Sequence, residues 1–307
     1  MEMILNMLTL DETEREEFSR LVSPEEQRFF PEGKESPDKK DYEQATIILG
    51  NPPAAALKDC QRLKLLHTRS AGVDQYSAPG VLPDGAVLLS ASGAYGHSVS
   101  EHMFAMLLGC MKRLPGYRDQ QRTGCWSDLG PVKTLKDALV LCVGTGDLGS
   151  SFAKQCKALG ARTAGVRRDA GKPAEGIDEM FSFDQLDNLL SRADVVALML
   201  PGGAATNKLM GRERIMKMKN DAILLNGGRG SIIDNDALAE IMDTGHLWGA
   251  CLDVTAPEPL PPEHPLWKQP RAVITPHVAG AYHLEETPHL IAEIVLRHVR
   301  DFLRKTE

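Results

Sequence analysis

The sequence predicts an α/β protein with two doubly wound parallel sheets, and three observations support this fold class. Short apolar runs alternate with amphipathic helical segments along the chain, as in strands joined by crossover helices. Runs such as 195–200 and 223–225 are apolar at successive positions, which is typical of strands covered by helices on both faces. The length of 307 residues allows about two domains.

The first hundred residues predict a small parallel sheet. Strands are expected in MILNML, TIILG, LKLLHTRS and AVLLSAS, with a helix in TLDETEREEFSRLV. A second, larger unit is expected to begin near Ser100. There the segment SEHMFAMLLGCMKRL is apolar on almost every side and opens with Ser and Glu, which predicts a buried helix with a polar cap at its start. This helix would join the two domains.

The alternation restarts near residue 138. Strands are expected in ALVLCVG, RTAGV, DVVALMLP, AILLNGG, GACLDV and AVITPH, and helices in SSFAKQCKALG, DQLDNLLSRA, GRERIMKMK and DNDALAEIMDTG. After Gly280, the tail HLIAEIVLRHVRDFLRK has apolar residues in a three-four rhythm, which predicts a helix that packs back on the first domain. The proline-rich stretch APEPLPPEHPLW predicts a loop.

Charge and composition exclude several kinds of partner. The formal net charge is -7, and no run of Lys and Arg is interleaved with aromatic residues, so nucleic acid is not expected to bind. No stretch approaches about 20 uninterrupted apolar residues, so no membrane span is expected. The acidic flank of the first apolar run differs from the positive flank of a signal peptide. We therefore expect a soluble, cytoplasmic protein.

The cysteines and most histidines do not predict a site. The six cysteines form no CxxC pair, and we interpret them as reduced, buried thiols, with no metal site. His97 lies in GAYGHSVSEH beside the domain junction and could reach a cleft between the domains. Of the others outside TPHVAG, His67, His102 and His298 are interpreted as core or surface residues, and four as solvated positions: His246, His264, His283 and His289.

A glycine loop predicts a dinucleotide site. Gly144, Gly146 and Gly149 form a GxGxxG motif with Asp147 and Leu148 between the last two glycines. The motif follows the strand 138–143 and precedes the helix 150–159. Two glycines allow a tight turn and close approach to a pyrophosphate, the third allows the helix to pack on the strand, and the helix N-terminus faces the anion.

The residues about 20 positions beyond this loop favour NADP(H). An acid that would bond the ribose 2′-hydroxyl of NAD is absent from the strand end, where Arg167 and Arg168 follow Val166. Either guanidinium could form charge-assisted hydrogen bonds to a 2′-phosphate. If the acidic position lies two residues further along the chain, Asp169 would bond the ribose 2′-hydroxyl, so NAD(H) stays an alternative.

Three residues in the last third of the chain predict acid-base chemistry on a keto acid. Arg229 follows the strand 222–226 and His277 follows the strand 272–274, so both belong to carboxyl-end loops, where doubly wound sheets bind ligands. A guanidinium can bind a carboxylate and a carbonyl oxygen together. An imidazole that protonates a developing alkoxide needs a partner that favours its charged form, and Glu258 is the candidate.

The chain resembles the D-isomer-specific 2-hydroxyacid dehydrogenase family over nearly its whole length. The resemblance rests on LKLLHTRSAGVD, ASGAYGHSVSEHMFAMLL, LVLCVGTGDLGSSFAK, DVVALMLPGGAATNKLMG, DAILLNGGRGSIIDNDALAEIM, HLWGACLDVTAPEPLPPEHPLW and AVITPHVAG. It implies a Rossmann coenzyme domain, residues 100–282, inserted in a flavodoxin-like substrate domain of residues 1–99 and 283–307. It also implies closure of the cleft between the domains before hydride transfer, and a homodimer joined through the coenzyme domains.

The resemblance assigns roles to matching residues. Arg229 would bind and polarise the substrate, His277 would be the acid/base, and Glu258 would orient and charge the imidazole. The remaining contacts that it implies are the substrate carboxylate at the backbone of Ala71, Gly72 and Val73, the nicotinamide carboxamide at Asp253, the adenosine at Leu200, Pro201 and Thr206, and the nicotinamide ribose at Gly227 and Gly228.

The expected activity is reduction of a small 2-keto acid to the D-2-hydroxy acid with NAD(P)H. A glyoxylate or hydroxypyruvate reductase is the alternative within the family, and a non-catalytic protein that senses nicotinamide nucleotides is the alternative outside it. Formate dehydrogenase is disfavoured because Glu258 is an acid where that relative has glutamine. The sequence departs from the family pattern in LPGGAATNKL and NGGRG. In NGGRG, glycine stands where the family often has Thr-Ala or Val-Ala, and this is expected to loosen the loop before Arg229.

Overall fold

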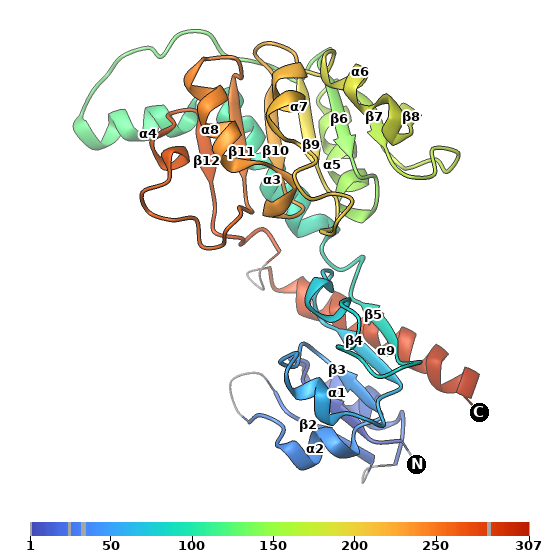
Figure 1. Ribbon diagram of the computed structural model, residues 1–307. Coiled ribbons are helices and arrows are strands. Elements are labelled where there is room, and N and C mark those ends of the chain that lie inside the picture. Colours follow the sequence, from blue (N-terminus) through green and yellow to red (C-terminus); the bar gives the residue numbers. More distant parts are fainter. Residues whose placement is uncertain (1, 24–25, 32–34, 281–283, 307) are drawn as a thin grey trace. The chain divides into compact units, whose positions relative to one another are not determined.

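The chain forms two compact units, which Figure 1 shows in a computed structural model. The structure describes residues 2–23, 26–31, 35–280 and 284–306. Unit 1 comprises residues 1–95 and 282–307, and unit 2 comprises residues 96–281. The divisions thus fall after residues 95 and 281, where the sequence predicts them after 99 and 282.

Unit 1 is built on a five-stranded parallel sheet with the order β2-β1-β3-β4-β5. This is the flavodoxin-like order that the family resemblance implies. Its strands are β1 (Ile4–Asn6), β2 (Gln27–Phe29), β3 (Ile47–Leu49), β4 (Leu65–Thr68) and β5 (Val87–Ser90). Its helices are α1 (Glu12–Ser19), α2 (Lys39–Gln44) and α9 (Glu286–Thr306).

The tail helix α9 belongs to unit 1, as expected. Ile291, Val295 and Val299 are buried along one of its faces, in the spacing of an amphipathic helix. At its polar edge, Arg300 pairs with Glu17 of α1 at 3.4 Å. The last helix therefore completes the fold of a unit whose other elements come from the start of the chain (Figure 1).

Unit 2 is built on a seven-stranded parallel sheet with the order β12-β11-β10-β9-β6-β7-β8. The chain runs outward from β6 in one direction and then outward from β9 in the other, so these neighbouring strands form a topological switch point. The strands are β6 (Leu139–Val143), β7 (Arg162–Val166), β8 (Glu179–Phe181), β9 (Val195–Leu198), β10 (Ile223–Asn226), β11 (Gly249–Leu252) and β12 (Ala272–Ile274). The helices are α3 (Gly96–Met111), α4 (Leu114–Thr123), α5 (Asp147–Ala158), α6 (Leu186–Leu190), α7 (Arg212–Lys217) and α8 (Asn235–Asp243).

The central strands of unit 2 are buried on both faces. Every residue of β9, β10 and β11 is buried, and the apolar side chains of one face pack with those of α6, α7 and α8. This explains the unbroken apolar runs in the sequence, because a strand covered by helices on both sides has no solvent-facing position.

Two expectations about the second unit were wrong. The long apolar helix α3 begins at Gly96, so Ser100 does not cap it; the Ser100 hydroxyl instead donates to the His97 carbonyl within the helix, a local bond that serine forms readily. Cys125 is exposed, whereas a buried thiol was expected. It follows α4, which buries none of its residues.

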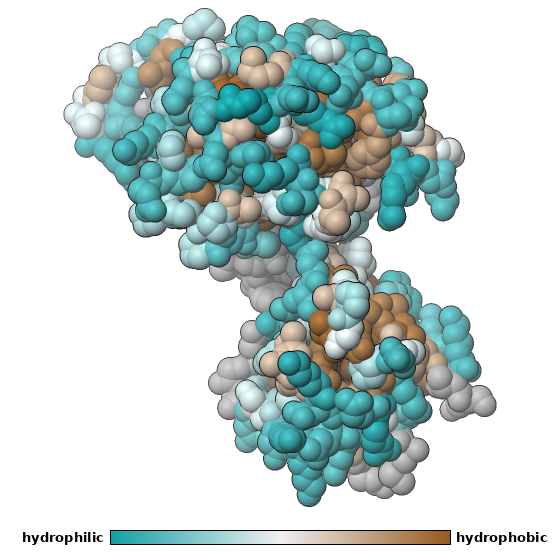
Figure 2. Space-filling model, viewed as in Figure 1, coloured by the Kyte–Doolittle hydropathy of each residue, from teal (hydrophilic) through white to brown (hydrophobic). Residues whose placement is uncertain are grey.

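Hydrophilic side chains cover most of the face of unit 2 that Figure 2 shows, whereas the visible face of unit 1 also carries a hydrophobic patch. Within the described ranges, no helix is long and apolar enough to cross a membrane. Leu114, Trp126 and Val132 are exposed large apolar side chains on or just after α4, the helix that Figure 1 shows at the β12 end of unit 2.

Candidate active site

Three loops meet at the carboxyl edge of the unit 2 sheet, and glycines permit their close packing. A Cβ atom on Gly144 would overlap the carbonyl oxygen of Met199, just past β9. A Cβ atom on Gly228, just past β10, would lie 2.5 Å from the carbonyl oxygen of Leu200. The loops after β6, β9 and β10 are therefore brought together at the switch point, where ligands of doubly wound sheets bind.

The three glycines of the GxGxxG motif have different surroundings. Gly144 has φ +96°, a conformation that favours glycine. A Cβ atom on Gly149 would overlap the carbonyl oxygen of Gly144, so this glycine holds α5 against β6. A Cβ atom on Gly146 would meet nothing within 4 Å. The space above Gly146, at the N-terminus of α5, fits the approach of a pyrophosphate.

Asp147 and Leu148 occupy the first turn of α5, and both are partly buried. The Asp147 carboxylate lies against the backbone of Gly96, where a Cβ atom would overlap its oxygens. Gly96 begins α3, so the carboxylate is close to the positive end of a second helix. This orientation directs the Asp147 side chain toward α3.

The two arginines lie just past the end of β7. The Arg167 amide donates to the Phe181 carbonyl at 3.1 Å, which holds the backbone beside β8. The Arg167 side chain is partly exposed and that of Arg168 is exposed. The Asp169 carboxylate pairs with Lys172 at 3.5 Å and accepts the Gly171 amide. The Asp169 side chain thus contacts residues of its own turn.

The remaining expected cofactor residues lie in the loops after β9 and β10. Leu200 is nearly buried against Gly144, while Pro201 is exposed. The Thr206 hydroxyl donates to the Pro201 carbonyl at 2.9 Å, so it braces this loop. Gly227 lies against Met103 of α3 and Met199. Leu200, Gly227 and Gly228 are brought together, with Pro201 and Thr206 at the rim.

Arg229 is positioned by the end of β10. Asn226, the last residue of the strand, accepts the Gly228 amide at 3.1 Å and donates to the Arg229 carbonyl at 2.9 Å. The next residue, Gly230, lies against the Thr255 carbonyl so closely that a Cβ atom would overlap it. The Arg229 loop is therefore packed on the segment that leads from Thr255 to Glu258.

Glu258 and His277 form a hydrogen-bonded pair. His277 Nδ1 lies 2.9 Å from one oxygen of Glu258, and the other oxygen accepts the Thr255 amide at 3.0 Å. An ionised carboxylate only accepts, so Nδ1 donates to Glu258 and Nε2 is the ring nitrogen that takes no part in this bond. The pair lines a pocket of ≈ 350 Å³ that also includes Trp267 and Pro276.

Asp253 holds the His277 segment in place. Its carboxylate is buried and accepts the Thr275 hydroxyl at 2.7 Å and the amides of Val278 and Ala279 at 3.0 and 3.1 Å. Its backbone carbonyl accepts the His277 amide at 2.7 Å. The expected contact with a nicotinamide carboxamide stays a prediction, since these bonds already give the carboxylate a structural role.

Two residues that hold predicted site segments in place, one in each unit, were not predicted from the sequence. His102 Nε2 lies 3.0 Å from the Thr275 hydroxyl, which brings α3 into the Asp253 network. Asn51 holds the loop after β4 in unit 1: its amide oxygen accepts the Arg69 amide at 3.0 Å, and its nitrogen donates to Ser70 at 2.9 Å. Both contacts join segments far apart in the sequence, so no local motif reveals them.

The loop after β4 contains the expected substrate contacts of unit 1. Ala71 is exposed, and Gly72 and Val73 are partly buried. The Ser70 hydroxyl donates to the Gly72 carbonyl at 2.7 Å, and the Tyr95 hydroxyl donates to the Arg69 carbonyl at 2.6 Å. The loop is thus ordered by its own hydrogen bonds, and its role toward the substrate stays a prediction.

The other histidines differ in their environments. His67 is fully buried on β4, as expected for a core residue. His264 was expected to be solvated, but its side chain is only 10% exposed and pairs with Asp236 at 3.2 Å. His97 is exposed and lies 3.8 Å from Glu101. His283 lies outside the described residues.

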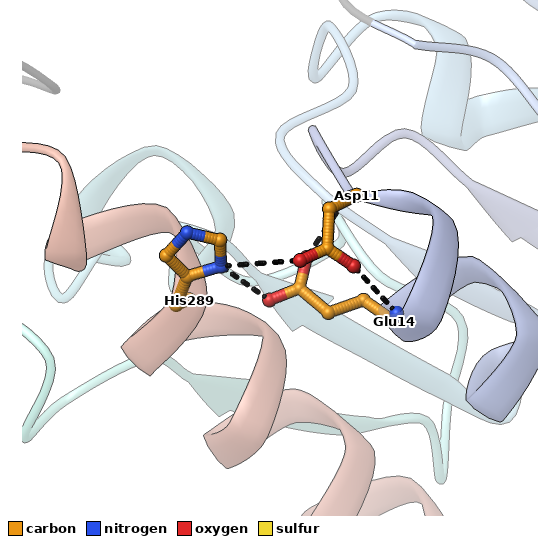
Figure 3. Close-up of side chains that lie close together, drawn as sticks. All are labelled: Asp11, Glu14 and His289. Carbon is orange, nitrogen blue, oxygen red and sulfur yellow. Dashed lines mark hydrogen bonds and ion pairs between the residues drawn. The ribbon is translucent and has the colours of Figure 1, made fainter.

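An acidic cluster in unit 1 is explained by helix capping. Figure 3 shows His289 of α9 facing Asp11 and Glu14 at the start of α1. Nδ1 of His289 lies 2.8 Å from Glu14, and this hydrogen bond raises the pKa of His289. Asp11 and Glu14 also form a capping box. The geometry would admit an ion, yet these two roles account for all three side chains.

Comparison with known proteins identifies the family. Residues 104–279 match the model of the NAD-binding domain of D-isomer-specific 2-hydroxyacid dehydrogenases. The glyoxylate reductase of Thermofilum pendens is 30% identical over 253 residues, which cover 80% of this chain and 74% of the relative.

Two solved structures extend the likeness over nearly the whole chain. A D-isomer-specific 2-hydroxyacid dehydrogenase family protein from Aeromonas salmonicida is 31% identical with a TM-score of 0.83, covering 99% of this chain and 97% of that one. A D-isomer-specific 2-hydroxyacid dehydrogenase from Xanthobacter autotrophicus, in complex with NADPH and MES, is 26% identical with a TM-score of 0.79, covering 98% and 95%.

Proposed function

Because this chain belongs to the D-isomer-specific 2-hydroxyacid dehydrogenases, a family of NAD(P)-dependent oxidoreductases, we propose that it reduces a small 2-keto acid to the D-2-hydroxy acid. The observation that carries the proposal is the hydrogen bond between His277 Nδ1 and Glu258 at 2.9 Å. This bond leaves the second ring nitrogen of the histidine as the group that donates a proton to the substrate.

The residues divide the work of the reaction. Arg229 binds the substrate carboxylate and the carbonyl oxygen through two sides of its planar guanidinium. His277 Nε2 gives a proton to the alkoxide that develops on the carbonyl oxygen, and Glu258 stabilises the charged imidazole. The backbone of Ala71, Gly72 and Val73 takes the substrate carboxylate from unit 1. A bound nicotinamide supplies the hydride.

The surroundings of Gly146 and of the β9 and β10 loops suit a dinucleotide. Open space at Gly146, at the start of α5, accommodates the pyrophosphate. Leu200, Pro201 and Thr206 would flank the adenosine, Gly227 and Gly228 the nicotinamide ribose, and Asp253 the carboxamide. The Asp253 carboxylate already accepts three hydrogen bonds within the protein. It would have to accept a fourth from the nicotinamide carboxamide.

We favour NADP(H) over NAD(H). Arg167 and Arg168 follow β7, and their guanidinium groups carry the charge that a 2′-phosphate needs. The Xanthobacter relative holds NADPH, which is consistent with this preference.

Replacing both Arg167 and Arg168 by Ala should weaken binding of NADPH while leaving that of NADH almost unchanged. Equal loss for both nucleotides would mean that the 2′-phosphate is bound elsewhere.

Glyoxylate and hydroxypyruvate are the first substrates to test. The relative from Thermofilum pendens is named a glyoxylate reductase, and such small substrates need few side-chain contacts.

The decisive experiment follows oxidation of NADPH and, separately, NADH against a panel of 2-keto acids and determines the chirality of the product. His277→Ala and Arg229→Ala should abolish most turnover and retain nucleotide binding. Nucleotide binding by the wild type without turnover of any keto acid would favour the sensor alternative.

We also propose that the protein is a homodimer joined through unit 2. Leu114, Trp126 and Val132 are exposed on and after α4, and Trp126 has no cover at all. Exposed apolar side chains gathered on one segment are typical of an interface. Light scattering in solution should give twice the mass of the chain, and Trp126→Ser with Val132→Ser should shift the protein toward the monomer.

A further inference from the structure

The segment that carries Glu258, residues 254–263, has almost no backbone hydrogen bonds of its own. Four of its ten residues are prolines, which have no amide proton to donate. Among the described residues, no backbone amide of this Glu258 segment donates to a backbone carbonyl. The position of Glu258 therefore depends on side chains that bond to the segment or pack with it.

A side chain of α8 anchors the segment just before Glu258. The amide nitrogen of Asn235 donates to the Ala256 carbonyl at 3.0 Å. On the other side of Glu258, the side chain of Leu260 is buried and belongs to the core of unit 2. Glu258 is thus held between a polar anchor at Ala256 and an apolar anchor at Leu260.

The anchor at Ala256 is connected to the carboxylate of Glu258. The Thr255 amide, one residue earlier, donates to one oxygen of Glu258 at 3.0 Å, and the Thr255 hydroxyl donates to the Pro257 carbonyl at 2.9 Å. These two bonds close a turn around Ala256. A displacement of Ala256 would move the Thr255 amide, and with it the carboxylate that contacts His277 Nδ1 at 2.9 Å.

Asn235 has a fixed position from which to hold this turn. It is the first residue of α8 and is only 5% exposed. Leu238 and Ile241 of the same helix are buried in the core of unit 2. Capping of the helix does not explain the Asn235 bond, because Asp234 is the cap residue and accepts the Ala237 amide at 3.3 Å.

The start of α8 also links the Glu258 segment to the loop of Arg229. From Arg229 the chain runs through a short 3₁₀ helix, Gly230–Ile232, to the cap of α8. At the start of this connection, Gly230 lies against the Thr255 carbonyl. The bond of Asn235 is a second contact between the same two parts of the chain. Both contacts therefore help to set the separation of Arg229 from the acid/base pair.

We propose that Asn235 is a positioning residue for the acid/base step, because it holds the Glu258 segment so that the carboxylate contacts His277. This inference rests on the proposed function, in which Glu258 stabilises the charged imidazole. Asn235 acts through Glu258 and not on the substrate. A displacement of about 1 Å can cost about 100-fold in rate, so loss of the anchor lowers kcat while binding is retained.

Two substitutions remove the donor at residue 235. Asn235→Ala removes the amide, and Asn235→Asp keeps the shape but places an acceptor against the Ala256 carbonyl. We expect each to lower kcat for keto-acid reduction by about 10- to 100-fold, with KM for the keto acid and the affinity for NADPH within about twofold of the wild type. Should Asn235→Ala fail to fold, Asn235→Asp carries the same test, because a carboxylate is favourable in the first turn of a helix.

The matched control is Ile241→Val, which trims a buried residue of the same helix. It loosens the packing of α8 but leaves the bond between Asn235 and Ala256 in place. We expect this variant to keep the wild-type kcat. An equal fall of kcat in Ile241→Val would mean that activity follows the stability of the helix, which would overturn the specific role of Asn235.

A double-mutant cycle examines whether Asn235 acts through Glu258. In a Glu258→Gln background the stabilising charge is already lost, so Asn235→Ala should lower kcat by less than about threefold. The full loss of about 10- to 100-fold in that background would mean that Asn235 supports turnover by another route. This result would also overturn the proposal.

Hydrogen exchange of the Thr255 amide reports the placement of Glu258 without any turnover. Because this amide is bonded to Glu258, we expect it to exchange at least about tenfold faster in Asn235→Ala than in the wild type, and at the wild-type rate in Ile241→Val. Unchanged exchange or unchanged kcat in Asn235→Ala and Asn235→Asp contradicts the proposal. A wild type that turns over no keto acid would instead refute the proposed function, while the exchange of Thr255 still decides whether Asn235 holds the Glu258 segment.

Discussion

The conformation of His277 is unusual and must be stabilised by its surroundings. Its φ is +53°, which costs a non-glycine residue roughly 1–2 kcal/mol. The hydrogen bonds of Asp253 to the backbone from His277 to Ala279 offset this cost. Backbone strain retained beside a hydrogen-bonded imidazole is typical of a functional position, so the geometry of this residue supports its proposed role as the acid.

Glu258→Gln tests the charge in the His277 pair separately from its hydrogen bond. The amide can still bond to Nδ1, but it no longer stabilises a charged imidazole. We expect kcat for keto-acid reduction to fall by about 100-fold or more, with the affinity for NADPH unchanged. Glu263→Gln, an exposed residue of the same proline-rich loop, is the matched control. Equal rates for Glu258→Gln and the wild type would refute the pairing as a catalytic device.

Gly146→Ala and Gly149→Ala should fail in different ways. The added methyl group at residue 149 overlaps the Gly144 carbonyl, so we expect the free energy of unfolding of unit 2 to fall by about 1–3 kcal/mol. The methyl group at residue 146 meets open space and should leave stability almost intact while it weakens nucleotide binding. Urea unfolding and fluorescence titration with NADPH would measure both. A Gly146→Ala protein that binds NADPH normally would contradict the position of the pyrophosphate.

At the level of elements, the sequence predicts best what is buried. The runs at β9, β10 and β11 are apolar because both faces are covered, so their strands were correctly predicted. The helix α4 was missed because none of its residues is buried, and a helix without an apolar stripe leaves no periodic pattern. The strands β2 and β8 were missed as well. Each lies at the edge of its sheet and carries an exposed residue, so neither has an unbroken apolar run.

For the candidate site, too, some residues could be predicted from the sequence and others could not. The residues at strand ends, such as Arg229 and His277, were found because doubly wound sheets bind ligands at that edge. His102 could not be found, since its bond to Thr275 joins residues 173 positions apart. The start of α3 was misplaced because Ser100 has the composition of a cap, while the chain begins the helix one turn earlier.

The pair of histidines between β4 and α9 predicts a loss of stability in acid. His67 Nε2 lies 2.9 Å from His298 Nδ1, and His67 Nδ1 lies 3.0 Å from the Thr68 carbonyl. Because that carbonyl only accepts, Nδ1 of His67 carries the proton and Nε2 accepts from His298. Burial lowers the pKa of His67 to about 4 and also lowers that of His298. A second proton on either ring therefore disfavours the folded state.

The sign of the effect follows from the depressed pKa of His67. Above about pH 6.5 the ring is neutral in both states; as pH falls toward about 4 the unfolded chain takes up the proton first, and about 3 kcal/mol of stability is lost. His67→Gln should flatten this part of the pH profile, measured by urea unfolding followed through hydrogen exchange in unit 1. His97→Gln, at an exposed position in unit 2, should not. A wild-type profile that is flat from pH 6.5 to 4 would contradict this account.

At the scale of the whole molecule, each unit has its own sheet and its own core. The core of unit 1 gathers Leu5, Ile48 and Leu66 with Tyr76, whereas the unit 2 core gathers the apolar residues of β6, β9, β10 and β11 with three helices. Two sets of buried side chains that share no member give each unit the means to unfold separately. A ligand of one unit can then stabilise that unit more than the other.

NADPH binding should therefore stabilise unit 2 selectively. At a free concentration of 100 times Kd, the ligand adds about 2.7 kcal/mol to the free energy of unfolding of the unit that binds it. All three tryptophans, Trp126, Trp248 and Trp267, lie in unit 2, so tryptophan fluorescence follows that unit during thermal unfolding. Hydrogen exchange of peptides from residues 1–95 follows the other unit. We expect the fluorescence transition to rise with NADPH and the exchange of unit 1 to change less; equal protection of both units would instead mean that the nucleotide is held by both.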